Sequence, residues 1–194
     1  MRTITKTEKP KALKRALVLS GGGARGAYEA GVLAYIYEEI CRDIDVAKKI
    51  DFFCGTSVGA IHAGFLASRA NLSDYDISSL CQWWSNNDIC DVLNFGLGQA
   101  MSLPKDLWSL FRSPESQGLL VNNQVIRRTV YEDIDWSQMR ENIRSGALQA
   151  LTVSATHIRS GRTVVFIEQK KKALPPWSRD KRRIARLASI GPEH

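Results

Sequence analysis

Short apolar runs alternate with segments of helical apolar spacing along the first half of the chain. The runs at 16–20 and 51–54 predict strands, and each precedes a segment whose apolar residues recur every three or four positions. In the second half, the segments 147–157 and 162–168 predict two strands joined by a turn at Ser160-Gly161. The predicted helices cover 27–42, 58–70, 74–85, 122–131 and 137–145. This order predicts an α/β fold, a three-layer α/β/α domain with a mainly parallel central sheet.

The length of 194 residues fits a single domain, predicted over 15–194 and preceded by a polar, basic and flexible tail over 1–14. No apolar run approaches the ~20 residues of a membrane span. The run after the tail is also shorter than the ~7–15 apolar residues of a signal peptide. These features predict a cytoplasmic protein, with at most a peripheral contact to a membrane.

The second strand runs directly into a Gly-x-Ser-x-Gly motif, Gly55-Thr56-Ser57-Val58-Gly59. This motif is typical of a nucleophile on a sharp strand-to-helix turn. Side chains two positions from the serine would collide with the strand and the helix, so Gly55 and Gly59 fit the turn. Ser57 then stands at the N-terminus of a helix, an end that favours developing negative charge.

The first strand ends in a second glycine motif, Gly21-Gly22-Gly23-Ala24-Arg25-Gly26. A glycine run of this kind offers backbone N–H groups to an oxyanion. Arg25 adds a planar cation suited to a phosphate or carboxylate. The motif also fits the dinucleotide fingerprint, but that fingerprint needs an acidic residue at the end of a following strand, about 20 residues on. Asp43 and Asp45 lie at that distance in a polar stretch without a strand, and no P-loop Gly-Lys-Ser/Thr follows.

The two glycine motifs and their spacing resemble the patatin-like phospholipase family, most clearly over 17–66. The resemblance implies a lipid acyl hydrolase of the phospholipase A, lysophospholipase or esterase type, with a Ser–Asp dyad and no metal or organic cofactor. It makes Ser57 the nucleophile and a lipid or phospholipid the substrate. It assigns the oxyanion region to Gly21, Gly22, Gly23 and Arg25, with Gly26 closing the turn into the helix.

One departure from the family pattern concerns the general base. The family aspartate precedes glycine late in the domain, and this chain contains no Asp-Gly dipeptide. We therefore expect the 194 residues to be a fragment that lacks the dyad aspartate and hydrolyses esters poorly or not at all. A catalytically silent module that binds lipid or a partner protein is the alternative.

Gly-x-Ser-x-Gly also occurs in α/β-hydrolases with a Ser–His–acid triad. His157 would be the base there, and Asp133 or Asp135 its acid. Such enzymes usually have several strands before the elbow, whereas one is predicted here. His62 lies five residues past Ser57 on the same helix, so we expect it to point away from the nucleophile.

Basic residues are concentrated in one segment of the chain. Residues 170–186 hold eight Lys or Arg and one acid, which equals the formal net charge of +7 for the whole chain. This segment could contact anionic membrane or form a solvated loop. Nucleic acid is not expected, because no binding motif accompanies the charge.

Two further features leave alternatives open. The apolar residues of 86–120 form either a cap over the serine and a lipid-contacting surface, or ordinary core under an irregular loop. The cysteines, Cys41, Cys54, Cys81 and Cys90, lack metal-site spacing and are predicted to be free thiols, so no metal site is expected.

Overall fold

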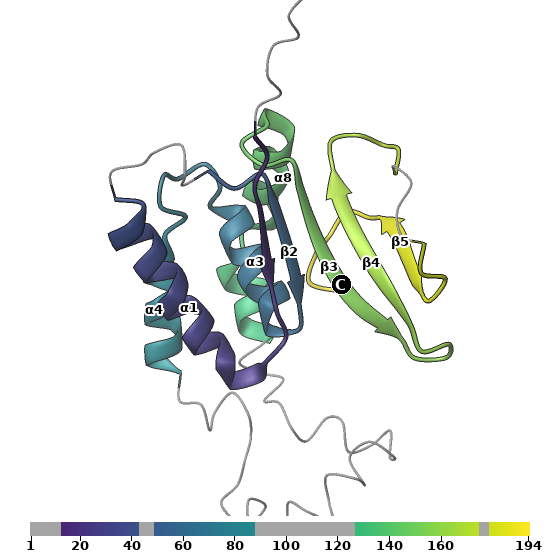
Figure 1. The fold of residues 1–194 in the computed structure, drawn as a ribbon, viewed down its shortest axis with the longest axis horizontal. Coiled ribbons are helices and arrows are strands. Elements are labelled where there is room, and N and C mark those ends of the chain that lie inside the picture. The colour runs from purple at the N-terminus through teal and green to yellow at the C-terminus, as the bar shows by residue number, and fades with distance from the viewer. Residues whose placement is uncertain (1–12, 43–48, 88–126, 175–178) are drawn as a thin grey trace, which may run out of the picture.

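The computed structural model of the protein describes residues 13–42, 49–87, 127–174 and 179–194. Its centre is a five-stranded sheet in the order β1-β2-β3-β4-β5 (Figure 1). Three of the four strand pairings are parallel, and the β3–β4 hairpin supplies the antiparallel one. The strands are β1 (Ala16–Leu19), β2 (Phe52–Thr56), β3 (Ala150–His157), β4 (Arg162–Gln169) and β5 (Arg183–Leu187). The predicted α/β class and mainly parallel sheet are confirmed.

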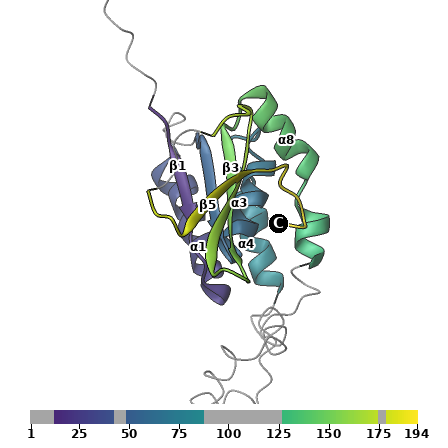
Figure 2. The same cartoon turned by 90° about the vertical axis from the view of Figure 1, so that its right-hand side faces the viewer.

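Helix α3 packs on the sheet, against β1, β2 and β3, and α8 packs on α3 (Figure 2). Helices α1 and α4 pack on each other beyond β1 (Figure 1). Three short helical segments join these elements. The bounds are η1 (Gly23–Arg25), α1 (Gly26–Tyr35), η2 (Ile36–Ile40), α3 (Val58–Ser68), α4 (Ile77–Asn86), η4 (Thr129–Asp133) and α8 (Trp136–Ser145).

Local sequence signals explain where α8 begins and ends. The Asp135 side chain accepts a hydrogen bond from the backbone N–H of Gln138 at 2.9 Å, as an N-cap does. Gly146 follows the last turn with φ 88°, a left-handed conformation that favours glycine. Within the fold, Asn142 of α8 donates to the carbonyls of Ala67 and Ser68 at 2.9 and 3.0 Å, which ties α8 to the end of α3.

The core lies between α3 and one face of the sheet. Leu17, Phe53 and Leu151 stand in register on three neighbouring strands, and the last two are fully buried. Helix α3 is apolar all round because it contacts the sheet on one side and α8 on the other. On the opposite face of the sheet, Val18 is 72% exposed.

Asp51 holds the start of the parallel strands together. It is buried, and its carboxylate accepts from Lys14 Nζ at 2.9 Å and from the Arg15 amide at 3.0 Å. Its backbone carbonyl accepts from the Gln149 amide at 2.8 Å, next to the first residue of β3. Lys14, from the predicted tail, is thus ion-paired, whereas residues 1–12 lie outside the described residues.

Part of the basic segment 170–186 forms strand β5 and is therefore not a solvated loop. Its residues Arg183–Leu187 pair in parallel with β4, where no strand was predicted. The sequence did not indicate this strand, because its arginines break the apolar pattern of a buried strand. At the edge of the sheet both Arg183 and Arg186 are exposed, so the strand tolerates them. The apolar residues of 88–120 and Cys90 lie outside the described residues, and Cys41, Cys54 and Cys81 are free thiols.

Candidate active site

Ser57 occupies a strained turn between β2 and α3. Its backbone has φ 55° and ψ −128°, a conformation that non-glycine residues rarely adopt. The turn is tight on both sides of the serine. A Cβ on Gly55 would overlap the backbone of Gly59 and Ala60, and a Cβ on Gly59 would overlap the Leu19 carbonyl. The side chain of Ser57 is exposed, so the turn presents a hydroxyl at the carboxyl end of the sheet.

The glycine motif after β1 lies directly beside this hydroxyl. A Cβ on Gly21 would stand 3.1 Å from Ser57 Cβ and 3.9 Å from Ser57 Oγ. Two amides near the motif have acceptors: Ser20 N–H donates to Glu29, and Arg25 N–H donates to the Gly22 carbonyl. Among the described residues, the amides of Gly21 and Gly22 have no such acceptor. Two backbone donors next to Ser57 are therefore available to a ligand oxygen.

The other residues of this motif form the turn into α1. Gly23 has φ 54° and begins η1, and Gly26 is buried at the start of α1. Arg25 is exposed beside the motif, and none of the described acids pairs with it. The structure thus brings all the predicted glycine-motif residues to the edge that carries Ser57.

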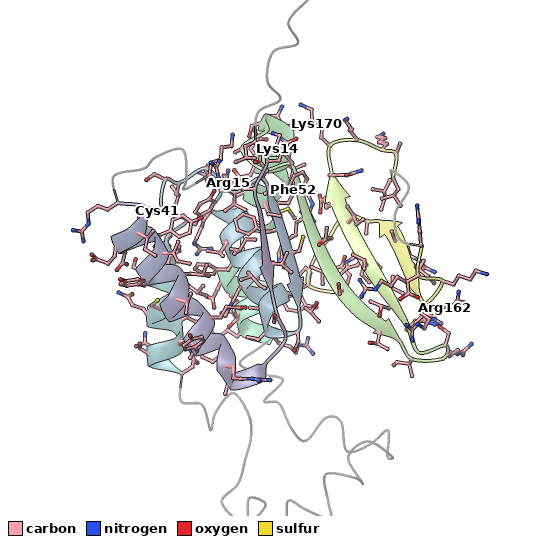
Figure 3. All side chains as sticks on the ribbon, viewed as in Figure 1. Lys14, Arg15, Cys41, Phe52, Arg162 and Lys170 are labelled. Carbon is pink, nitrogen blue, oxygen red and sulfur yellow. The ribbon has the colours of Figure 1, made fainter. Side chains whose placement is uncertain are left out.

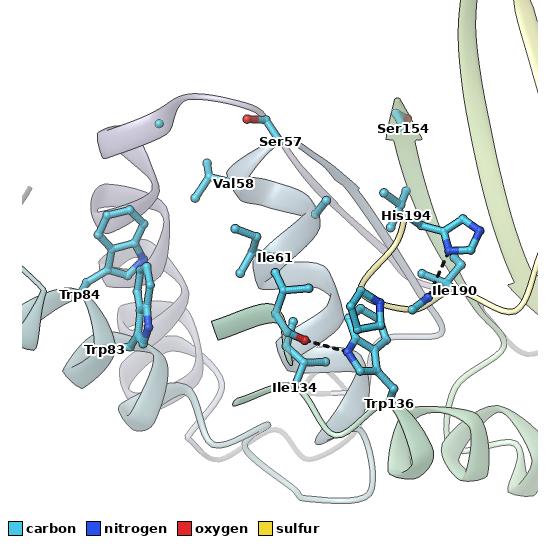
Figure 4. A pocket seen from close by; sticks show the side chains of 16 residues that line it. Ser57, Val58, Ile61, Trp83, Trp84, Ile134, Trp136, Ser154, Ile190 and His194 are labelled. Atoms are coloured by element: carbon cyan, nitrogen blue, oxygen red, sulfur yellow. Dashed lines mark hydrogen bonds between the residues drawn. The ribbon is translucent and has the colours of Figure 1, made fainter. Parts of the chain in front are cut away.

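An apolar cavity of about 330 Å³ opens next to Ser57. Figure 4 shows Trp83 and Trp84 on one side and Trp136 and Ile190 across from them, with Ser57 at one edge. The volume is at the lower end of the ~300–1,000 Å³ of small-molecule sites. The lining comprises Gly23, Ser57, Val58, Ala60, Ile61, Trp83, Trp84, Val130, Ile134, Trp136, Val153, Ser154, Ile190, Gly191, Pro192 and His194.

Residues 190–192 and His194 line a part of the cavity that the sequence did not predict. The Ile190 amide donates to Glu168 at 2.6 Å, and Arg140 Nη2 donates to the Ile190 carbonyl at 3.1 Å. Burial raises the pKa of Glu168, although the Ile190 amide and Arg140 oppose the rise. Trp136 was also missed as a lining residue; its indole donates to the Val130 carbonyl at 2.8 Å. The contacts of Ile190 join distant parts of the chain, so no local sequence signal predicts them.

Within the described part of the chain, no candidate base is hydrogen-bonded to Ser57. None of its Asp, Glu or His side chains is hydrogen-bonded to Ser57 Oγ. His157 is exposed at the end of β3 and bonds Ser160 at 2.8 Å, while Asp135 caps α8. Neither bonds to the other, so the geometry does not support a Ser–His–acid triad.

His62 is fully buried and contacts Glu29 and Trp84. Its Nδ1 lies 2.9 Å from Glu29 Oε2, and its Nε2 lies 2.9 Å from the Trp84 indole nitrogen. Burial lowers the pKa of His62, although the neighbouring Glu29 carboxylate opposes the shift. His62 is therefore neutral at pH 7.

Basic residues reach the carboxyl end of the sheet, where Ser57 lies. Thr56, the last residue of β2, pairs with Ser154, so β3 extends three residues further, about 10 Å. The hairpin that follows carries Ile158, which is 94% exposed, beside Arg162. Arg183 of β5 pairs with the next residue of β4. Figure 3 shows Arg162 at this end of the sheet and Lys170 at the other.

Two features are absent from the described residues. Within those ranges, no helix combines the length and the apolar character needed to cross a bilayer. In the same part of the chain, no three His, Cys, Asp or Glu side chains gather as metal ligands would.

Comparison with known proteins agrees with this geometry. The model of the patatin-like phospholipase family matches residues 17–183, which include both glycine motifs and Ser57. Neither a curated protein nor a solved structure matches the chain. The family match spans most of the 194 residues. The chain belongs to the patatin-like phospholipase family.

Proposed function

We propose that the protein is a serine-dependent lipid acyl hydrolase in which Ser57 attacks the acyl carbonyl. The observation that carries the proposal is the juxtaposition of an exposed Ser57 hydroxyl, the unpaired Gly21 and Gly22 amides, and an apolar cavity. The amides would hold the oxyanion that forms when the hydroxyl adds to the carbonyl. The cavity would receive one acyl chain of the lipid, and Arg25 would attract an anionic group at the rim.

The reaction proceeds in two steps. Ser57 Oγ loses its proton to a base and forms a bond to the carbonyl carbon. The oxyanion then collapses and breaks the ester bond, and the leaving oxygen takes the proton from the base and departs as the alcohol of the lipid. Water then hydrolyses the acyl-serine and releases the fatty acid. In our proposal the base is an aspartate, as in a Ser–Asp dyad. A positioned base typically contributes ~10²–10⁴ in rate.

The test is covalent labelling of Ser57 with an alkyl fluorophosphonate, followed by peptide mass spectrometry. We expect labelling at Ser57 and none in Ser57→Ala, with Ser154→Ala as the matched control because Ser154 lines the same cavity. Labelling of a different residue, or equal labelling of both variants, contradicts the proposal. Binding to lipid vesicles without any labelling would favour the alternative of a catalytically silent module.

We also propose that the basic segment 170–186 brings the protein to anionic membranes, chiefly through its residues at the Ser57 end. Arg182 and Arg183 are 87% and 60% exposed, although both also contact Asp180. They adjoin the hairpin with Ile158, and a projecting aliphatic side chain among cations suits a lipid interface. Each basic residue near an anionic surface contributes roughly 1 kcal/mol.

A pair of charge reversals tests which end of the segment makes the contact. The variant Arg182→Glu/Arg183→Glu alters the hairpin end of the segment, and Lys171→Glu/Lys172→Glu makes the same charge change at the other end of the sheet. In a Ser57→Ala background, we expect the first to lower partition onto phosphatidylglycerol-containing vesicles about 30-fold, for roughly 2 kcal/mol. The second is expected to change it far less. Equal effects of the two variants, or equal binding to neutral phosphatidylcholine vesicles, would overturn this proposal.

A further inference from the structure

Three side chains from three helices connect the glycine motif to the wall of the cavity. Glu29 on α1 accepts the Ser20 amide at 3.1 Å with one carboxylate oxygen and contacts His62 Nδ1 at 2.9 Å with the other. His62 on α3 contacts the indole nitrogen of Trp84 on α4 at 2.9 Å. Ser20 directly precedes Gly21, and Trp84 lines the cavity.

The chemistry of these groups allows one arrangement of protons. The Trp84 indole can only donate, so His62 Nε2 must be an unprotonated acceptor. The single proton of the neutral imidazole is then on Nδ1, where it is donated to the Glu29 carboxylate. Each of the three donors in this series of hydrogen bonds has an acceptor. The Ser20 amide and His62 Nδ1–H both donate to Glu29, and the Trp84 indole donates to His62.

Close packing holds the same groups in position. A Cβ on Gly26 would lie 2.5 Å from the Trp84 ring and 3.1 Å from the His62 ring, so both rings rest on the backbone where α1 begins. The His62 side chain is 1% exposed, which excludes water as a substitute partner. Rigid surroundings of this kind make the position of Trp84 depend on the position of the glycine motif.

We propose that Glu29, His62 and Trp84 form a positioning relay that fixes the Gly21 and Gly22 amides relative to the cavity wall. The relay keeps the oxyanion donors and the acyl-binding surface at one spacing around Ser57. Its effect on reaction rate rests on the proposed function, whereas its proton arrangement does not. These three groups are positioning residues, because none of them touches the reacting atoms.

Glu29→Gln is the informative substitution, because it keeps the shape and leaves one acceptor oxygen where two are needed. If that oxygen serves Ser20, the amide NH₂ faces His62 and forces the imidazole proton onto Nε2, against the Trp84 N–H. If it serves His62, the NH₂ faces the Ser20 amide. Glu38→Gln is the matched control, since it makes the same change at an exposed site just beyond α1.

The first measurement is the ¹⁵N NMR spectrum of the imidazole and indole groups in the unmodified protein. We expect His62 as the Nδ1–H tautomer, and a Trp84 indole proton that exchanges slowly with solvent. A predominant Nε2–H tautomer, or a rapidly exchanging Trp84 indole proton, would overturn the relay. This experiment needs no enzymatic activity, so it remains decisive if Ser57 proves not to be a nucleophile.

The second measurement is the rate at which the fluorophosphonate labels Ser57 in a double-mutant cycle. We expect Glu29→Gln to slow labelling about 10- to 100-fold, the order caused by misplacing reacting groups, and Glu38→Gln to leave it unchanged. Trp84→Phe removes the conflicting N–H, so Glu29→Gln should slow labelling several-fold less in that background than in the unmodified one. Equal rates for the two Gln variants, or strictly additive effects in the cycle, would refute the proposal.

Discussion

Substituting Ser57 by glycine and by alanine separates the strain of the turn from the loss of the hydroxyl. The φ of 55° and ψ of −128° match the first central position of a type II′ turn, which glycine dominates. A residue held in such a region costs about 1–3 kcal/mol. Glycine relieves that strain but costs about 0.5–1 kcal/mol more in chain entropy than alanine. The net expectation is that Ser57→Gly is more stable than Ser57→Ala by about 0.5–2 kcal/mol.

The hydroxyl itself contributes little to this difference, because both variants lose it and Ser57 is exposed. Urea denaturation with an unchanged m-value gives the difference in unfolding free energy. In a thermal melt each kcal/mol corresponds to about 2–4 °C for a chain of this size. Ser85 on α4 is the control, since glycine there should be less stable than alanine, as in ordinary helices. If position 57 gives the same order as position 85, the turn stores no strain and the reasoning fails.

Three other predictions follow from packing and charge. Gly59→Ala should destabilise the protein by roughly 1–3 kcal/mol, because the Cβ meets the Leu19 carbonyl, whereas Gly31→Ala should not, since nothing lies within 4 Å of a Cβ there. Chemical denaturation measures both, and a tolerated Gly59→Ala would contradict the close contact. Asn142→Leu should cost about 2 kcal/mol for two lost bonds to α3, and a cost under about 0.5 kcal/mol would refute the tie between the helices. Burial pushes the pKa of Asp51 upward, but the Arg15 amide and Lys14 hold it below its ordinary value. The contribution of Asp51 to the free energy of unfolding is therefore present above about pH 4 and lost as the pH falls through the folded-state pKa. In Asp51→Asn, the urea midpoint should therefore fall less between about pH 6 and pH 2.5 than in the unmodified protein. An unchanged slope would exclude Asp51 as a source of acid sensitivity.

The turn at Ser57 could be predicted because its signals are local. A strand, two glycines and a helix occupy adjacent positions, and the five residues of the Gly-x-Ser-x-Gly motif place glycine at both sites where a Cβ would collide. Strands β1 and β2 were predictable for the same reason. The glycine motif directly follows β1, as Ser57 directly follows β2. Because β1 and β2 pair in parallel, the motif and Ser57 lie at the same edge of the sheet.

The cavity and the buried polar contacts were not predictable from one sequence. Glu29 and His62 are 33 positions apart, and nothing in the spacing relates them. Hydrogen bonds from the backbone of Ile190 to Glu168 of β4 and Arg140 of α8 hold Ile190 at the cavity. Strand β5 was missed because an edge strand tolerates arginines on positions that a central strand would bury.

The contact of Gly59 with the end of β1 has a consequence for redesign. Because helix α3 begins against the Leu19 carbonyl, the proposed nucleophile Ser57 and the proposed amide donors are held at a fixed spacing by the backbone. A chain with a different acyl preference must therefore be sought by altering the far side of the cavity, at Ile134, Trp136 or Ile190. Side chains there can be exchanged for smaller or larger ones while the reacting groups keep their spacing.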